Sequence, residues 1–152
     1  MKNSEGYYDP TAGRAMSSAM KDYKKLQKDK WLKEQERKRP KMVYVISPYA
    51  GNVRANVANA IDYCRYVIAE GYMPVASHLL YPQMLNDDIP EERALGTSFG
   101  MALLSGCQEA WVFGEHISKG MGAELDECKK LHIPIRYLKE EEYADFSTRR
   151  SK

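Results

Sequence analysis

The sequence predicts an α/β fold: a doubly wound, mostly parallel sheet of four to five strands with helices on both faces, preceded by an N-terminal helical arm. Two observations lead to this prediction. From Lys41 onward, short apolar runs typical of buried strands alternate with longer segments of helical periodicity. Such alternation is the pattern of a parallel sheet covered on both faces. Before Lys41 the chain is polar and strongly basic instead.

Composition limits the class of protein. A chain of 152 residues with 43% hydrophobic and 29% charged residues fits one globular domain with a core. No apolar run approaches the roughly 20 residues that span a bilayer, so no membrane partner is expected. The polar N-terminus shows no signal peptide, which predicts a cytoplasmic protein. The three cysteines form no CxxC pair and the three histidines are scattered, so we expect reduced thiols, no metal and no cofactor.

The basic arm is expected over residues 1–40, before an α/β domain at 41–152. Between Lys21 and Lys41 there are ten basic and four acidic residues, a net +6 in a chain of net +2, so the remainder carries −4. Turn residues fill 1–13, and helical spacing predicts one helix over 14–39, ended by Pro40. Its apolar stripe predicts docking on the domain or on a second copy, and hence a homo-oligomer. The stripe comprises Met16, Met20, Tyr23, Leu26 and Trp31. The alternative is a helix for nucleic acid, but no base-reading motif accompanies it, so nucleic acid is not an expected partner.

Within the domain, strands are expected at 42–47, 72–77, 109–114 and 133–138, and helices at 53–70, 90–105 and 121–131. Pro74 weakens the second strand and predicts an edge position. A long loop is expected over 78–89, and Pro90 suits the first turn of the next helix. The first of these helices has a predicted buried face of Val53, Val57, Ile61, Cys64, Val67 and Ile68.

Ligands of parallel α/β sheets bind at the carboxyl ends of the strands. Here those ends carry residues 47–52, residues 77–78 and residues 114–122. The last of these segments leads to Ser118, Gly120, Gly122 and Glu124, at the start of the third helix. A helix N-terminus presents unpaired N–H groups to an anion such as phosphate, and glycines let the backbone approach it. We expect Glu124 in the first helical turn, kept ionised by the helix dipole. The simpler interpretation is a glycine turn with a Glu that only favours the dipole.

Several enzyme classes are excluded by missing motifs. No GxGxxG follows the first strand and no acidic residue ends the second, which argues against a dinucleotide-binding domain. No GxxxxGK[ST] is present, which excludes a P-loop. The chain contains no GxSxG motif and no Ser/His/Asp set, so a serine hydrolase is not expected.

Two segments together resemble the nucleoside 2-deoxyribosyltransferase superfamily. They are Tyr44-Val45-Ile46-Ser47-Pro48 at the first strand and the Ser118–Glu124 segment that opens the last predicted helix. The superfamily includes 2'-deoxynucleoside 5'-phosphate N-hydrolases and uncharacterised bacterial and phage domains. The similarity covers about residues 41–138 and leaves the arm unexplained.

The resemblance implies roles for individual residues. Glu124 matches the nucleophile that attacks the anomeric carbon of deoxyribose, and Tyr44 matches a tyrosine beside it. Ser118 matches the serine that holds the 5'-phosphate in the hydrolases, with Gly120, Met121 and Gly122 in the same loop. The loop after the first strand supplies further candidate ligand contacts: Ser47, Pro48, Tyr49, Asn52 and Arg54. His78 resembles a histidine of the hydrolases, and Tyr49, Tyr81 and Met84 are candidates to stack on a base.

One departure bears on activity. The family has an aspartate that hydrogen-bonds or protonates the departing base, and its position falls near Met101, where no carboxylate occurs. His78, Glu115 or His116 would have to substitute. The sequence therefore predicts an enzyme that acts on the N-glycosidic bond of a nucleoside monophosphate or related nucleotide. The alternative is a non-catalytic protein that binds a nucleotide or a nucleotide-derived signal; a structural protein that works through its basic arm is a third.

Overall fold

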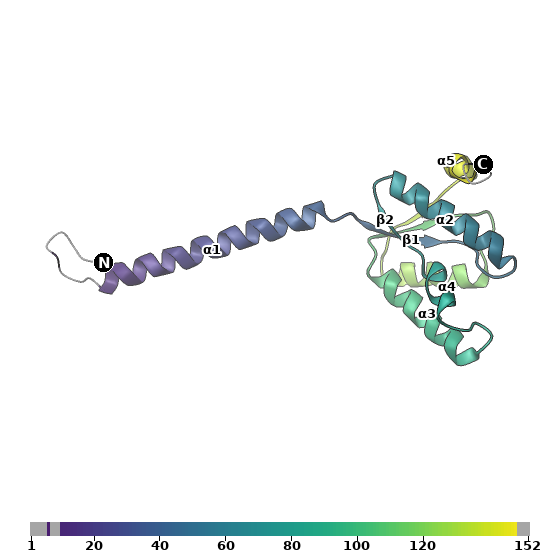
Figure 1. Ribbon diagram of the computed structural model, residues 1–152, viewed down its shortest axis with the longest axis horizontal. Coiled ribbons are helices and arrows are strands. Elements are labelled where there is room, and N and C mark those ends of the chain that lie inside the picture. Colours follow the sequence, from purple (N-terminus) through teal and green to yellow (C-terminus); the bar gives the residue numbers. More distant parts are fainter. Residues whose placement is uncertain (1–5, 7–9, 149–152) are drawn as a thin grey trace. The chain divides into compact units, whose positions relative to one another are not determined.

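The computed structural model describes residue 6 and residues 10–148, and the chain divides into two units, residues 1–39 and 40–152. Figure 1 shows the elements of each unit. No helix in the described ranges is both long enough and apolar enough to cross a bilayer.

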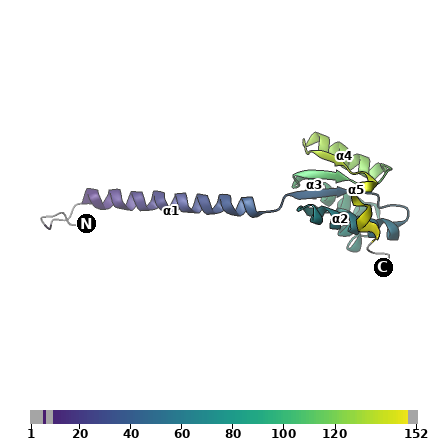
Figure 2. The same ribbon diagram turned by 90° about the horizontal axis from the view of Figure 1, so that it is seen from above.

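The first unit contains a single long helix, α1 (Pro10–Lys38), drawn without a break in Figure 2. It begins four residues before the predicted start at residue 14, because Pro10 fits a first helical turn, where its missing N–H would have no partner. Basic residues occupy its last turn, where they complement the helix dipole. None of its residues is buried. The predicted apolar stripe is exposed, with Trp31 58% and Leu26 65% accessible.

We predict that the full chain is a homodimer or larger, because a helix cannot bury its own apolar stripe and most of the stability of a helix in a protein comes from packing such a face. Light scattering on the full chain and on a version that begins at Lys41 would measure this. The truncated version should have a smaller oligomeric mass or a lower stability. The prediction would be refuted if the full chain is monomeric and the truncation changes neither its oligomeric state nor its stability.

The second unit is built on a four-stranded parallel sheet, as the sequence predicts, and its strands lie in the order β2-β1-β3-β4. The strands are β1 (Met42–Ile46), β2 (Met73–Val75), β3 (Glu109–Val112) and β4 (Ile135–Tyr137). The strand with Pro74 lies at an edge, also as predicted. From β1 the chain winds outward to β2, and from β3 it winds the other way to β4. The point between β1 and β3, where the winding reverses, is where ligands bind in such sheets.

Helices cover both faces of the sheet (Figure 1). They are α2 (Val53–Ala69), α3 (Pro90–Ser105), α4 (Lys119–Lys130) and α5 (Glu140–Thr148). Alternate side chains of β1 divide the core in two. Val43 and Val45 pack with α2 and α5 on one face. Tyr44 and Ile46 pack with α3 and α4 on the other.

The buried face of α2 differs from the prediction. Val53 is 42% and Ile68 is 60% exposed, whereas Tyr63 and Tyr66 face the core. The tyrosines replace the aliphatic residues because the opposite wall is aromatic: the ring of Tyr63 stacks on Phe113 with centroids 4.6 Å apart. The helix ends as expected before Gly71, whose φ of 89° favours glycine.

Two features of the loops were not predicted. The segment 78–89 contains two short 3-10 helices, η1 (Ser77–Leu79) and η2 (Tyr81–Gln83), instead of an unstructured loop. The sequence pattern also predicts no element after residue 138, where α5 forms. Tyr143 of α5 is buried and makes edge contacts with Tyr63 and Phe113.

Candidate active site at the carboxyl ends of the strands

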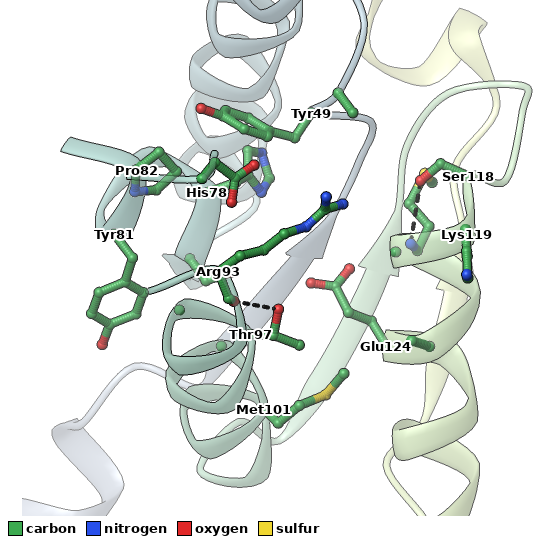
Figure 3. Close-up of a pocket in the computed structure, with 18 of the residues that line it drawn as sticks. Tyr49, His78, Tyr81, Pro82, Arg93, Thr97, Met101, Ser118, Lys119 and Glu124 are labelled. Carbon is green, nitrogen blue, oxygen red and sulfur yellow. Dashed lines mark hydrogen bonds between the residues drawn. The ribbon is translucent and has the colours of Figure 1, made fainter. Parts of the chain in front are cut away.

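A cavity of about 320 Å³ opens at the carboxyl ends of the strands, between α3 and α4 (Figure 3). The loops after β1, after β2 and before α4 meet there, as the sequence predicts. Of the candidate residues, it is lined by Ser47, Tyr49, His78, Tyr81, Ser118, Gly120, Met121 and Glu124. Its volume lies at the lower end of the range for small-molecule sites.

A chain of hydrogen bonds connects Glu124 to the centre of the sheet. The Tyr44 hydroxyl donates to Glu124 Oε1 at 2.8 Å and lies 2.7 Å from Ser77 Oγ. Tyr44 is fully buried in β1, so its ring and hydroxyl are fixed by the core. One carboxylate oxygen of Glu124 is therefore held by Tyr44, while the carboxylate points into the cavity in Figure 3.

The expected position and charge of Glu124 need correction. Helix α4 begins at Lys119, with Ser118 as its N-cap, so the two glycines lie inside the helix and the first turn contains no acidic residue. Glu124 falls in the second turn, where the field of the helix end is weaker. Burial raises the pKa of Glu124 to about 7, and the hydrogen bond from Tyr44 opposes this rise only in part. The carboxyl is therefore not strongly held in its ionised form.

The start of α4, where the sequence predicts an anion site, is capped by the side chain of Ser118. Ser118 Oγ accepts a hydrogen bond from Met121 N at 3.3 Å, and Gly122 N is bonded to Ser118 O. This leaves the backbone N–H groups of Lys119 and Gly120 for a ligand or water. A Cβ added at Gly120 would meet no atom within 4 Å, so there is space for a ligand against the backbone.

His78 and Ser47 form a second polar pair in the cavity. His78 Nε2 lies 3.1 Å from Ser47 Oγ, and Ser47 is buried. Burial lowers the pKa of His78 to about 4, so its ring is neutral at pH 7. A neutral imidazole is a poor proton donor at this pH and a competent acceptor.

Several residues predicted to contact a ligand do not line the cavity: Pro48, Asn52, Arg54, Met84 and Gly122. Tyr44 does not line it either, because it is fully buried and reaches Glu124 from the core. Asn52 is the N-cap of α2, with Oδ1 accepting from Ala55 N at 3.2 Å. Arg54, in the first turn of α2, is exposed. Pro48 lies against Gly114, where an added Cβ would meet its ring at 3.5 Å.

The proposed substitutes for the missing carboxylate are only partly in place. Met101 lines the cavity, so a thioether stands where a carboxylate would be needed. His78 also lines it. Glu115 lies on a separate hollow beside Leu138 and α5, and His116 is exposed and does not line the cavity.

Sequence reasoning missed the wall formed by α3 and the loop before it. Asp87, Glu92, Arg93 and Thr97 line the cavity, and Arg93 points into it in Figure 3. A signal was present in the sequence. Residues 93 and 97 precede Met101 in steps of four residues, a spacing that places all three on the same face of the helix. No group of three or more His, Cys, Asp or Glu side chains suited to a metal ion occurs in the part of the chain that the structure describes.

The dependence of activity on pH tests the protonation state of the Glu124 carboxyl. If the ionised carboxylate acts, kcat/KM should fall about tenfold for each pH unit below about 7. Tyr44→Phe removes the hydrogen bond that lowers the pKa of Glu124, so its midpoint should lie above that of the wild type. Tyr63→Phe, on the other face of the sheet, should leave the midpoint unchanged. A wild-type midpoint near 4.5, the ordinary value for Glu, would contradict the burial of this carboxyl.

The sequence of residues 41–138 matches a family described as a domain of unknown function, DUF7768. The chain belongs to this family. No functionally curated protein matches the chain in sequence. Among solved structures, the DUF7768 domain is similar to the 2-deoxyribosyltransferase of the psychrotolerant bacterium Bacillus psychrosaccharolyticus. The TM-score is 0.51 at 14% identity, over 63% of this chain and 70% of that chain. The DUF7768 domain therefore has a deoxyribosyltransferase-like fold.

Proposed function

We propose that this DUF7768 domain acts on the N-glycosidic bond of a nucleoside monophosphate or related nucleotide, with Glu124 as the nucleophile. The observation that carries the proposal is the hydrogen bond from a fully buried Tyr44 to Glu124 at the wall of the cavity. It holds one carboxylate oxygen and orients the other for attack. The fold of the 2-deoxyribosyltransferase supports the same class of chemistry.

The reaction would proceed in two displacements. In the first, Glu124 forms a bond to the anomeric carbon while the carbon–nitrogen bond breaks and its electron pair leaves with the base, which takes up a proton from solvent water. In the second, water or another base attacks the same carbon and releases the Glu124 carboxylate. Retaining glycosidases use a carboxylate nucleophile in the same manner.

The phosphate of the ligand would bind at the start of α4. Ser118 Oγ and the N–H groups of Lys119 and Gly120 supply donors there, and the positive end of the helix favours an anion. Arg93 from α3 would supply a positive charge to the ligand in place of Arg54, since Arg93 points into the cavity (Figure 3) and Arg54 does not line it.

One observation favours a second candidate, a nucleotide-binding protein without turnover. The cavity presents Met101 at the position where a proton donor to the base is needed, and burial keeps His78 neutral. A general acid contributes on the order of 100- to 10,000-fold to such rates. Binding with no base release would favour this candidate.

The test is to incubate the protein with deoxynucleosides and their 5'-monophosphates and to measure both base release and intact bound ligand. Monophosphates should bind at least about tenfold more tightly, since hydrogen bonds to a charged group contribute roughly 1.5–3 kcal/mol each. Ser118→Ala should reduce this preference and cost about 1 kcal/mol of stability as a lost N-cap. Ser98→Ala, on an exposed position of α3 outside the cavity lining, is the control. Equal affinities for nucleoside and monophosphate would refute the phosphate site.

A further inference from the structure

The lining of the cavity includes an aromatic ring and a carboxylate that the proposed mechanism does not use. Tyr49 comes from the loop after β1, and Asp87 comes from the loop before α3; both line the cavity. The ring of Tyr49 is tilted by 49° against that of His78, with centroids 5.9 Å apart (Figure 3). Burial raises the pKa of the Tyr49 phenol and the negative charge of Asp87 raises it further, which places the carboxylate near this ring.

Both loops are held in place by hydrogen bonds between their backbone and nearby side chains. Asn56 Nδ2 donates to the carbonyl oxygens of Tyr49 and Ala50, each at 3.0 Å. On the other side, the Glu92 carboxylate accepts a hydrogen bond from Asn86 N. Asp87 is the next residue, so this contact fixes the backbone that carries it. A ring and a carboxylate positioned before binding lose little entropy when a ligand arrives.

We propose that Tyr49 and Asp87 form the base-recognition end of the cavity and select a base with an exocyclic amino group; this inference rests on the proposed function. Guanine is the base that matches best. The Tyr49 ring offers a stacking surface, which every base accepts. Asp87 provides the choice among bases, because an ionised carboxylate only accepts hydrogen bonds and so requires N–H donors on the ligand. Guanine carries a ring N–H beside its amino group, and the two oxygens of one carboxylate can accept from both.

The test compares deoxyguanosine 5'-monophosphate with deoxyinosine 5'-monophosphate, which differ by this amino group alone. Affinities would be measured by calorimetry with the full-length wild type and Asp87→Asn. The wild type should bind the guanine nucleotide about tenfold to a hundredfold more tightly, the range expected for a hydrogen bond to a charged group. In Asp87→Asn the two affinities should agree within about threefold. Asp88→Asn is the matched control, since Asp88 is exposed and lies outside the cavity lining.

Base release from the guanine nucleotide, measured on the same wild-type sample, separates the two proposals. Equal affinities in the wild type, or a preference that survives in Asp87→Asn, would overturn the role of Asp87 even if base is released. A preference that depends on Asp87, without base release, would support base recognition and refute catalysis. If neither nucleotide binds at millimolar concentration, both proposals fail.

Discussion

Glu124→Gln is expected to reduce base release by at least about a thousandfold, because the amide cannot act as the nucleophile and removal of such a group usually costs this much or more. Nucleotide binding should persist, since the amide keeps the shape of the side chain and its oxygen still accepts from Tyr44. Asp126→Asn, on an exposed position of the same helix outside the cavity lining, should retain full activity. Turnover within tenfold of the wild type in Glu124→Gln would remove this residue from the mechanism.

The same variant should be more stable than the wild type at high pH. A carboxyl whose pKa is about 7 in the folded state and near 4.5 in the unfolded chain holds its proton more tightly when folded. The contribution of this carboxyl to the free energy of unfolding is fully present below pH 4.5 and is lost as the pH rises through 7. The loss amounts to about 1–3 kcal/mol. The amide carries no such cost. Urea unfolding at pH 5 and pH 8 should show a wild type that loses stability between the two relative to Glu124→Gln; parallel changes in the two proteins would contradict the raised pKa.

Tyr143→Ala is expected to destabilise the domain by about 3–5 kcal/mol, the range for removing a buried aromatic ring. Tyr143 is only 5% exposed and contacts the rings of Tyr63, Tyr66 and Phe113. Phe113 follows β3 directly, so the loss would loosen the strand end from which the chain runs on to α4.

Tyr143→Phe separates the ring from its hydroxyl. The hydroxyl accepts a hydrogen bond from Gly114 N at 3.3 Å, and its removal should cost about 0.5–1.5 kcal/mol. Equilibrium unfolding in urea measures both variants. A cost below about 1 kcal/mol for Tyr143→Ala would mean that α5 is not an integral part of the core.

The order of the elements was predictable because it depends on local pattern. Apolar runs that alternate with helical spacing gave the parallel sheet, and Pro74 gave its edge. The dependence on local pattern also explains the errors in the predicted face of α2 and in the missing α5. The buried face of α2 was wrong because two tyrosines are directed inward by the aromatic rings of β3 and α5, which only the folded structure brings together. Helix α5 is nine residues long, and such a short helix depends on contacts distant in sequence.

The candidate site was likewise predicted in part, where its residues are close in the sequence. The spacing of Ser118 and Glu124 pointed to one wall of the cavity, since both belong to one helix start. On the opposite wall, Arg93 shares a helical face with Met101 and could have been found from that spacing. Asp87 belongs to the loop before α3, whose position depends on the folded structure and not on any local spacing. The pKa of Glu124 was misjudged for a related reason: the helix dipole is a local effect, whereas burial depends on the whole fold.

The strand order also governs when the site can form during synthesis. The two site residues joined by the hydrogen bond from Tyr44 to Glu124 are 80 positions apart, and β1 must wait for β3, its neighbour at the centre of the sheet. Contacts of such separation slow folding, because a long loop must close before they contribute. A nascent chain that ends before residue 109 therefore carries β1, whose residues 43–46 become fully buried, with one edge unpaired. Until the ribosome has released β3, that edge is the part of the molecule most exposed to aggregation.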